Sequence, residues 1–328
     1  MLRSETAAQP ERMAAALKGL RAYQQAERTP PPGLMPVVDE AHGAMLRDYG
    51  GTGAPVLFVP SLINPPNILD LDEEKSLLRW LSAQGHRVLL LDWGVDSESR
   101  RSMNVADHVE RILVPLAERL EQPPALVGYC LGGTMAIAAA ALTRVRVLAT
   151  IAAPWHFSGF PPEAREMLQS LWQAAGPAAA AMGVLPMEVL QSAFWSLDPG
   201  RTVSKFEAFA QMGPGSAEAR SFVTLEDWAN EGPPVSEAAA RELFESFFRD
   251  DLPGTGRWRV GGRVVRPQDD GHRTFHIVSA TDRIVPHQSA VRAGEQLKLA
   301  QGHVGMVIGS RARELLWKPL DTWLRPRP

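Results

Sequence analysis

The feature that most constrains the fold of this chain is a series of short apolar runs separated by helical patterns. Runs that are apolar on both faces are typical of strands buried within a parallel sheet. Between them lie helix-like segments, such as the apolar stripe of Val105 to Leu120 and the alanine-rich stretch of Ala136 to Leu142. Strands and helices that alternate in this way predict an α/β fold with a mostly parallel, doubly wound sheet. The runs are Pro55 to Pro60, Arg87 to Asp92, Pro124 to Tyr129, Val145 to Ile151 and Thr274 to Ser279.

The alternation is interrupted between about Trp155 and Pro267, a stretch far too long for a loop. Its apolar and aromatic residues follow a helical spacing, and one hairpin is expected across Gly261 and Gly262. We therefore predict a mainly helical cap inserted into the α/β core, although residues 225–234 fit no element clearly. Before the core, a short helix leads into a proline-rich strap. The predicted parts are residues 1–36 (helix and strap), 37–154 (core), 155–267 (cap) and 268–328 (core).

Composition excludes several classes of protein. The chain carries 34 Lys and Arg against 37 Asp and Glu, a near balance that argues against nucleic-acid binding. No run approaches the roughly 18 apolar residues of a membrane span, and the charged N-terminus is a poor signal peptide, so we expect a cytoplasmic protein.

His272 and His276 are four residues apart, a spacing that would place two metal ligands on one face of a helix. Since His276 lies in a strand pattern instead, we expect no metal site.

The single cysteine, Cys130, is either a buried apolar side chain or a reactive thiol. It lies in Gly128-Tyr129-Cys130-Leu131-Gly132-Gly133, directly between a predicted strand and a predicted helix. This is the nucleophile-elbow pattern with a thiol in place of the usual hydroxyl, and its glycines would avoid collisions with the neighbouring strand and helix. At a helix N-terminus the dipole favours a thiolate. The pattern therefore indicates that Cys130 is a nucleophile.

An elbow enzyme with the α/β-hydrolase fold needs an acid and then a histidine later in the chain. Asp282 follows the run that ends at Ser279, and His303 lies between glycines before the last helix. The order Cys130, Asp282, His303 is the order of that fold. His287, close behind Asp282, is the nearest rival and is more simply explained as the start of a helix.

Other residues are expected around the nucleophile. The N–H of Leu131 is one predicted oxyanion donor, and the second is expected from Ser61 or Leu62, since the loop after the first core strand faces the elbow in this fold. Asn64 and Tyr129 are predicted to line the substrate pocket. His156, which follows a strand end, is a further pocket candidate.

These motifs together resemble the polyhydroxyalkanoate (PHA) synthases, most closely the shorter type without a large N-terminal domain. The resemblance includes Gly85 to Val88 and Asp92 to Gly94, as well as the cysteine box at Gly128 to Gly133. It extends through the acid and histidine motifs, and is weakest in the cap. The strand before the histidine, reduced to about Leu297 to Leu299, is shorter than the family leads us to expect. The further motifs are Val59 to Leu71, Lys75 to Leu77, Trp80-Leu81, Asp282 to Pro286 and Gly302 to Gly305.

The resemblance implies an acyltransferase that polymerises (R)-3-hydroxyacyl groups from coenzyme A (CoA) thioesters and releases CoA. Cys130 would carry the acyl group, His303 would act as base, and Asp282 would orient His303 or help activate the incoming hydroxyl. It implies no cofactor, a growing polyester as second substrate, self-association or a partner subunit, and a place at polyester granules. Two alternatives remain open: a thioesterase, esterase or polyester depolymerase on the same fold, and a non-catalytic granule or scaffold protein.

Overall fold

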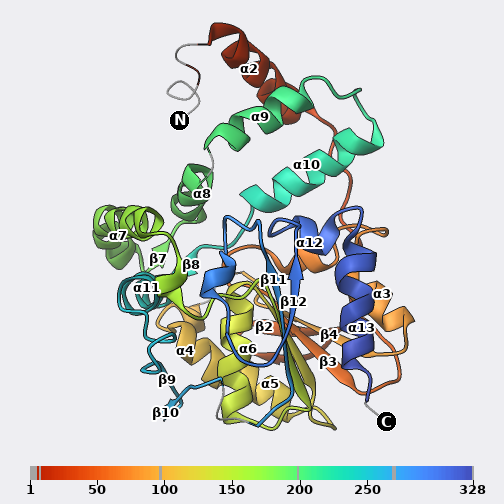
Figure 1. Cartoon of the computed structure of the whole chain (residues 1–328), viewed down its shortest axis with the longest axis vertical. Coiled ribbons are helices and arrows are strands. Elements are labelled where there is room, and N and C mark those ends of the chain that lie inside the picture. The colour runs from red at the N-terminus through yellow and green to blue at the C-terminus, as the bar shows by residue number, and fades with distance from the viewer. Residues whose placement is uncertain (1–5, 7–8, 96–97, 198, 268–270, 327–328) are drawn as a thin grey trace.

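An eight-stranded sheet forms the centre of the molecule (Figure 1). The computed structural model describes residues 6, 9–95, 98–197, 199–267 and 271–326. Across the sheet the strands follow the order β1, β2, β4, β3, β5, β6, β11, β12, and all pairs from β4 to β12 are parallel. The predicted α/β-hydrolase fold with a doubly wound sheet is confirmed. The strands are β1 (Val37–Ala41), β2 (Ala44–Asp48), β3 (Pro55–Val59), β4 (Arg87–Asp92), β5 (Ala125–Tyr129), β6 (Val147–Ile151), β11 (Thr274–Ser279) and β12 (Glu295–Leu299).

Helices cover both faces of the sheet because its strands alternate buried side chains toward each face. In β3, Leu57 and Val59 pack into one apolar cluster, whereas Val56 and Phe58 pack into the other. The first face is covered by α4 (Val105–His108), η3 (Val109–Leu113), α5 (Val114–Glu118) and α6 (Leu131–Leu142). The second face is covered by α3 (Leu77–Ala83), η7 (Arg313–Trp317) and α13 (Lys318–Leu324).

Two strands of the central sheet were not predicted, and one is longer than predicted. The hairpin of β1 and β2 extends the sheet at one edge, where both strands run antiparallel to their neighbours. The strand β1 lies at the exposed edge of the sheet. Its residues include Asp39 and Glu40, so β1 lacks the apolar run that is typical of a central strand. At the other edge, β12 spans Glu295–Leu299 and pairs with β11 along its whole length.

The predicted helical cap is present between β6 and β11, with its short strands β7 (Val184–Leu185) and β8 (Val235–Ser236) paired antiparallel. The predicted hairpin across Gly261 and Gly262 is formed by β9 (Arg259–Val260) and β10 (Arg263–Val264). The boundary that we predict at residue 268 lies outside the described residues. The cap helices are α7 (Pro162–Met182), α8 (Met187–Leu197), α9 (Pro199–Phe209), α10 (Ala217–Asn230), α11 (Glu237–Arg241) and the π-helical η5 (Glu242–Arg249).

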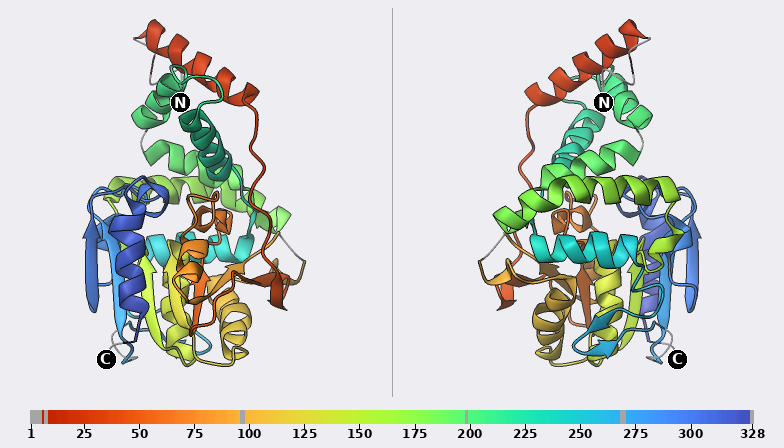
Figure 2. Two further views of the ribbon diagram at one scale, coloured as in Figure 1. Left: turned by 90° about the vertical axis from the view of Figure 1, so that its right-hand side faces the viewer. Right: turned by 90° about the vertical axis from the view of Figure 1, so that its left-hand side faces the viewer.

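The N-terminal helix α2 (Pro10–Gln25) lies on the cap, at the end of the molecule far from the sheet (Figure 1). Arg12 forms an ion pair with Glu207 of α9 at 2.7 Å, and the Tyr23 hydroxyl donates to Asp227 of α10 at 2.6 Å. The strap then runs back along the side of the molecule to the core (Figure 2), where the guanidinium of Arg47 donates to the carbonyl oxygen of Met35 at 3.0 Å. The first 36 residues, as far as they are described, therefore connect the cap to the core.

Replacing Gly19 with alanine is expected to detach α2 from the cap. A Cβ atom at Gly19 would lie 1.8 Å from the carbonyl oxygen of Phe206, so the two helices could not keep their approach. Limited trypsin digestion should then cleave α2 at Lys18 and Arg21 much faster than in the unmodified chain. The matched control is Gly33→Ala in the strap, where an added Cβ meets nothing within 4 Å. Equal cleavage rates for the two variants would contradict this packing.

Two buried histidines are expected to make the fold sensitive to acid. Burial lowers the pKa of both His108 and His276 to about 4. His276 shares a hydrogen bond with the Thr150 hydroxyl at 2.8 Å. Between pH 6.5 and about 4 the unfolded chain binds protons that the folded chain does not, so stability falls as the pH falls.

From pH 7 to pH 5, each of these histidines should lower the free energy of unfolding by about 2 kcal/mol. Urea unfolding at the two pH values measures the difference, and His276→Gln should reduce it by about the share of one histidine. An unchanged difference in that variant would show that His276 is not the group being protonated.

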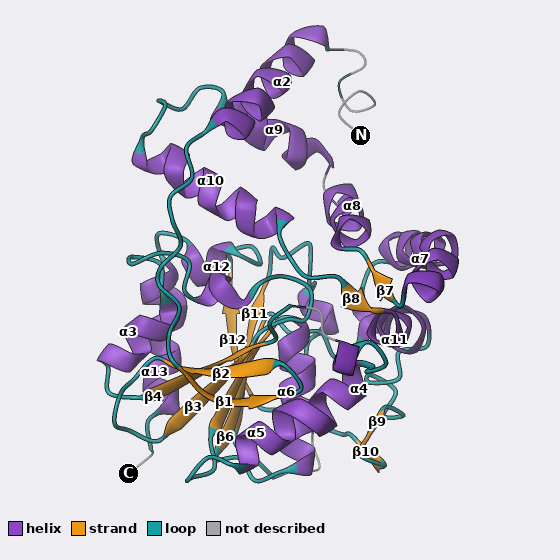
Figure 3. Cartoon of the chain, turned by 180° about the vertical axis from the view of Figure 1, so that it is seen from behind, coloured by secondary structure: helices purple, strands orange, loops and turns teal. Residues whose placement is uncertain are grey.

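Within the described residues, no helix is long and apolar enough to cross a membrane. The fold can also be followed from behind in Figure 3, where the strands lie between the layers of helices and the cap extends to one end.

Candidate functional site

Cys130 occupies a sharp turn between β5 and α6. Its backbone has φ 55° and ψ −131°, a conformation that costs energy for any residue with a side chain. The turn is held because the N–H of Cys130 donates to the carbonyl oxygen of Ile151 at 2.9 Å, and the N–H of Gly133 donates to the carbonyl oxygen of Cys130 at 2.8 Å. The sulfur is therefore presented at the carboxyl end of the sheet and the N-terminus of a helix.

The glycines around Cys130 allow β5, α6 and the loop after β3 to approach one another. A Cβ at Gly128 would lie 2.3 Å from the Cα of Gly133, and one at Gly132 would lie 2.1 Å from the carbonyl oxygen of Val59. Contacts this short do not occur between real atoms, so larger residues would displace the backbone. The steric reason inferred from the motif is confirmed.

Asp282 and His303 are hydrogen-bonded to each other beside this turn. Asp282 follows β11 and His303 follows β12, and Nδ1 of His303 lies 2.6 Å from Oδ2 of Asp282. The other carboxylate oxygen accepts the N–H groups of Ile284 and Val285 at 2.8 and 2.9 Å. A carboxylate only accepts hydrogen bonds, so Nδ1 of His303 donates and Nε2 is left for a partner on the other side of the ring.

The electrostatic environment of His303 favours its charged form. Burial alone lowers the pKa of His303, but the charges of Asp282 and Cys130, together with hydrogen bonds to both, raise it to about 10. Cys130 and His303 also line the same cavity, which is described below. A histidine with this pKa keeps its proton at neutral pH, which suits a partner in the thiolate form.

Tyr129 packs against His303 rather than facing open solvent. The two ring centroids are 5.1 Å apart, and the Tyr129 hydroxyl donates to the carbonyl oxygen of His303 at 3.4 Å. Burial, followed by the charges of Cys130 and Asp282, raises the pKa of Tyr129 well above its usual value, so the phenol stays neutral. Tyr129 therefore helps to hold the imidazole in place.

A cavity of about 480 Å³ opens beside these side chains, between the core and the cap. We refer to it as the Cys130 cavity. Its volume falls within the range of small-molecule sites. The indole N–H of Trp228, on α10, donates to the carbonyl oxygen of Pro65 at 2.9 Å and joins the cap wall to the core loop. The core contributes Ser61, Ile63, Asn64, Tyr129, Cys130, Asp282 and His303, and the cap contributes Gln191, Phe194, Trp195, Lys205, Phe222, Leu225, Glu226 and Trp228, among others.

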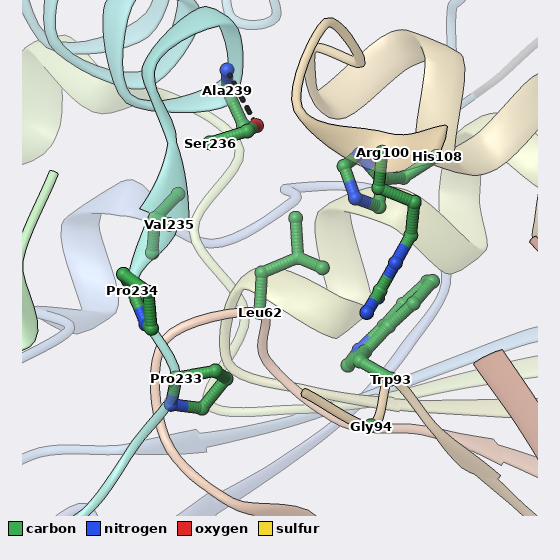
Figure 4. A pocket seen from close by; sticks show the side chains of 10 residues that line it. All are labelled: Leu62, Trp93, Gly94, Arg100, His108, Pro233, Pro234, Val235, Ser236 and Ala239. Atoms are coloured by element: carbon green, nitrogen blue, oxygen red, sulfur yellow. Dashed lines mark hydrogen bonds between the residues drawn. The ribbon is translucent and has the colours of Figure 1, made fainter. Parts of the chain in front are cut away.

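Of the predicted oxyanion donors, Leu131 is the first residue of α6, and Ser61 lies in the loop opposite. The Ser61 hydroxyl accepts the N–H of Ile63 at 3.2 Å, which fixes the turn of that loop. Leu62 directs its side chain into a second cavity of about 30 Å³, bordered by Trp93, Arg100 and His108 (Figure 4). That cavity is too small for an acyl chain. The indole N–H of Trp93 donates to the carbonyl oxygen of Pro60 at 3.1 Å, so Trp93 supports the loop from behind.

Asn64 and Tyr129 line the Cys130 cavity, but His156 does not. The reason is local: the N–H groups of Trp155 and His156 both donate to the carbonyl oxygen of Ser289, at 2.6 and 2.8 Å. This contact draws the chain toward η6 (His287–Ser289) and away from the cavity. The expectation for His156 is therefore wrong.

The cap contributes residues that the sequence did not single out. Of residues 225–234, which fit no element clearly in the sequence, residues 225–230 form the second half of α10, and residues 231–234 belong to no helix or strand. Leu225, Trp228 and Ala229 recur at helical spacing and line the Cys130 cavity, as do Lys205 and Glu226. This helical spacing is the signal in the sequence that could have predicted the wall of the cavity. Within the described residues, no group of three His, Cys, Asp or Glu side chains is placed to hold a metal ion.

Comparison with solved structures shows the same fold. A carboxylesterase of Nitrososphaera gargenis superposes with a TM-score of 0.53 at 13% identity, covering 88% of this chain and 98% of that one. A monoacylglycerol lipase of Paleococcus ferrophilus superposes with a TM-score of 0.51 at 12% identity, covering 86% and 98%. At these identities the likeness concerns the fold alone.

Comparison with curated sequences finds poly(3-hydroxyalkanoate) polymerase subunits PhaC. The protein of Haloarcula marismortui is 25% identical over 88% of this chain and 64% of its own length, and that of Haloferax mediterranei is 26% identical over 83% and 59%. This chain thus spans about three-fifths of the length of these relatives. The protein of Allochromatium vinosum is 25% identical over 83% of this chain and 81% of its own length. The resemblance to PHA synthases is confirmed.

The family model described as the alpha/beta hydrolase family matches residues 56–316, most of the described core together with the cap. The turn at Cys130 and the acid and histidine that follow it in the expected order all lie within this match. The chain therefore belongs to the alpha/beta hydrolase family.

Proposed function

We propose that this chain is a PHA synthase-like acyltransferase that takes (R)-3-hydroxyacyl groups from CoA thioesters through a thioester on Cys130. The observation that carries the proposal is the thiol at the elbow, beside a histidine that is hydrogen-bonded to a buried carboxylate. Similarity to the PhaC proteins over most of the chain supports the substrate class.

Before the substrate reacts, His303 holds the proton that the Cys130 thiol has given up, and in the first step the thiolate attacks the thioester carbon of the substrate. The N–H of Leu131, together with that of Ser61 or Leu62, would stabilise the negative oxygen that forms. When the intermediate collapses, the bond to the CoA sulfur breaks. The leaving thiolate takes the proton from His303, so free CoA departs and the acyl group stays on Cys130.

The second step needs His303 as a base. Acylation removes the negative charge of the Cys130 sulfur, which is one of the causes of the raised pKa of His303. The pKa of His303 should therefore fall once the acyl group is in place. The neutral imidazole then takes the proton of an incoming 3-hydroxyl group, whose oxygen attacks the thioester and releases the Cys130 thiolate.

Asp282 is proposed to orient His303 rather than to take the hydroxyl proton itself. Both of its carboxylate oxygens are already engaged, one by His303 and the other by two backbone N–H groups. Neither oxygen is therefore left without a partner in the protein, and the imidazole of His303 is the group that remains to take the hydroxyl proton.

The cap is proposed to favour transfer to a hydroxyl over hydrolysis. Phe194, Trp195 and Phe222 form an aromatic wall over the Cys130 cavity, which would restrict the access of water to the thioester. The growing polyester would occupy this side of the site. A cytoplasmic location at the granule surface and association with a second copy or another subunit belong to the same proposal, supported by the word subunit in the names of the relatives.

Product analysis separates this function from its alternatives. Purified protein is given (R)-3-hydroxybutyryl-CoA, and free CoA, free 3-hydroxybutyrate and ester oligomers are measured. Oligomers formed with release of CoA support the proposal. Free 3-hydroxybutyrate in amounts equal to CoA would make the protein a hydrolase, and the absence of any CoA release would favour a non-catalytic role.

A further inference from the structure

An ion pair lies in the cap wall of the Cys130 cavity and has no part in the steps above. Lys205 of α9 and Glu226 of α10 both line the cavity, and their Nζ and Oε2 atoms are 2.6 Å apart. The Glu226 side chain is 8% exposed and that of Lys205 is 25% exposed, so the pair is largely enclosed. Both groups therefore border the cavity while most of their surface is covered by neighbouring residues.

Burying this ion pair in an apolar wall costs free energy of folding unless a ligand also binds to it. Its neighbours on the wall are mainly apolar, and the Lys205 ammonium also lies 5.1 Å from the centroid of the Phe206 ring. Removing two charges from water often costs more than their attraction returns, and apolar residues of similar size would hold two helices together as well. A polar pair retained in an apolar wall therefore points to a polar group on the ligand.

The pair offers both a donor and an acceptor. Among the described residues, Nζ of Lys205 donates only to Glu226, and Oε1 of Glu226 has no hydrogen-bond partner. An ammonium can donate three hydrogen bonds and a carboxylate can accept several, so each group retains capacity. The net charge of the pair is zero. A phosphate would be repelled by Glu226, and a hydrocarbon chain would leave both groups without partners.

A neutral group with one acceptor and one donor fits this pair best, and an amide is such a group. We propose that Lys205 and Glu226 bind the amides of the pantetheine arm of the thioester substrate, with Lys205 donating to an amide oxygen and Glu226 accepting an amide N–H. The inference rests on the proposed function, since it assumes a CoA thioester. It adds a subsite that recognises the carrier rather than the acyl group.

The position of the pair agrees with a carrier that enters from solvent. Arg201 lies one turn before Lys205 on α9, lines the same cavity and is exposed. Cys130 and the buried His303 line the same cavity. A long arm that reaches Cys130 through this cavity would therefore have the pair on one of its walls.

The test compares three thioesters of one acyl group, (R)-3-hydroxybutyrate. The CoA ester carries the full pantetheine arm, the N-acetylcysteamine ester keeps a single amide, and the ethanethiol ester has none. The variant is the double substitution Lys205→Met with Glu226→Leu, because a single substitution would leave one enclosed charge without its partner. The matched control is Lys318→Met with Glu314→Leu, which removes an exposed ion pair between η7 and α13 of the core.

For the double variant, kcat/KM for the CoA ester should fall roughly tenfold or more through a higher KM, with a smaller loss for the N-acetylcysteamine ester. The ethanethiol ester should react at the same rate in the variant, the control and the unmodified chain. Equal losses for all three esters, or no loss for any, would overturn the subsite.

A binding measurement makes the inference independent of turnover. Titration calorimetry with pantetheine should show weaker binding to the Lys205 and Glu226 double variant than to the unmodified chain and the control. Equal affinities would overturn the subsite even if no thioester is turned over, whereas failure of every ester to acylate Cys130 would count against the proposed function. If the double variant does not fold, the exchanged pair Lys205→Glu with Glu226→Lys takes its place. The exchanged variant should retain pantetheine binding, because it still presents one donor and one acceptor. If it loses both pantetheine binding and turnover of the ethanethiol ester, the pair has a general structural role, and this would count against the subsite.

Discussion

Replacing Cys130 with alanine is expected to lower the rate of CoA release from (R)-3-hydroxybutyryl-CoA by roughly 10³-fold or more, since loss of a nucleophile removes the covalent route altogether. The sulfur is the only thiol of the chain, lies at the strained elbow and borders the same cavity as His303. CoA release is followed with a thiol reagent. The variant is made in parallel with Cys130→Ser, which keeps a smaller nucleophile at the same position.

The structure predicts that both variants fold. The Cys130 side chain is only partly buried, so removing the sulfur leaves little unfilled space in the core. Thermal unfolding within a few degrees of the unmodified chain would confirm this. Undiminished CoA release from a folded Cys130→Ala protein would show that another group accepts the acyl chain.

Replacing His303 with glutamine is expected to slow acylation of Cys130 by roughly 10²- to 10⁴-fold, the range typical for loss of a general base. Glutamine keeps a polar side chain of similar length but cannot exchange a proton at neutral pH. Rapid-quench measurement of the first turnover isolates this step from the later transfer. The structure supplies a matched control in His156→Gln, because His156 lies outside the Cys130 cavity.

The control should acylate at the rate of the unmodified chain. Rapid formation of acyl-Cys130 in the His303→Gln variant would exclude His303 as the base of the first step. A loss of equal size in both variants would point to a general effect of histidine replacement on folding.

The core of the fold could be predicted from the sequence because its signals are local. Central strands are apolar on both faces, and Gly128, Gly132 and Gly133 form a short motif that is recognisable in the sequence, although Gly132 is required by a contact with the distant Val59. The relation of Asp282 to His303 also follows from chain order, since both lie in loops at the carboxyl ends of neighbouring strands. The positions of these residues could therefore be predicted without knowing how the cap folds.

The features that the sequence did not predict depend on packing between distant segments. The edge strand β1 carries Asp39 and Glu40, so its pattern is not that of a core strand. His156 follows β6 as expected, but its backbone is held by Ser289, far along the chain. Lys205 and Glu226 become neighbours only because α9 packs beside α10, and neither residue belongs to a recognisable motif. Local patterns therefore located Cys130, Asp282 and His303, whereas the cap residues that line the cavity beside them could be found only from the three-dimensional structure.

The most direct test of the central claim, that Cys130 carries the acyl group, is the mass of the intact protein after brief mixing with (R)-3-hydroxybutyryl-CoA and quenching in acid. We predict a fraction heavier by one or more 3-hydroxybutyryl units, with the added mass on the peptide that contains Cys130 and absent from Cys130→Ala. Release of CoA without any added mass on that peptide, at the same rate in Cys130→Ala, would contradict the acyl-cysteine mechanism.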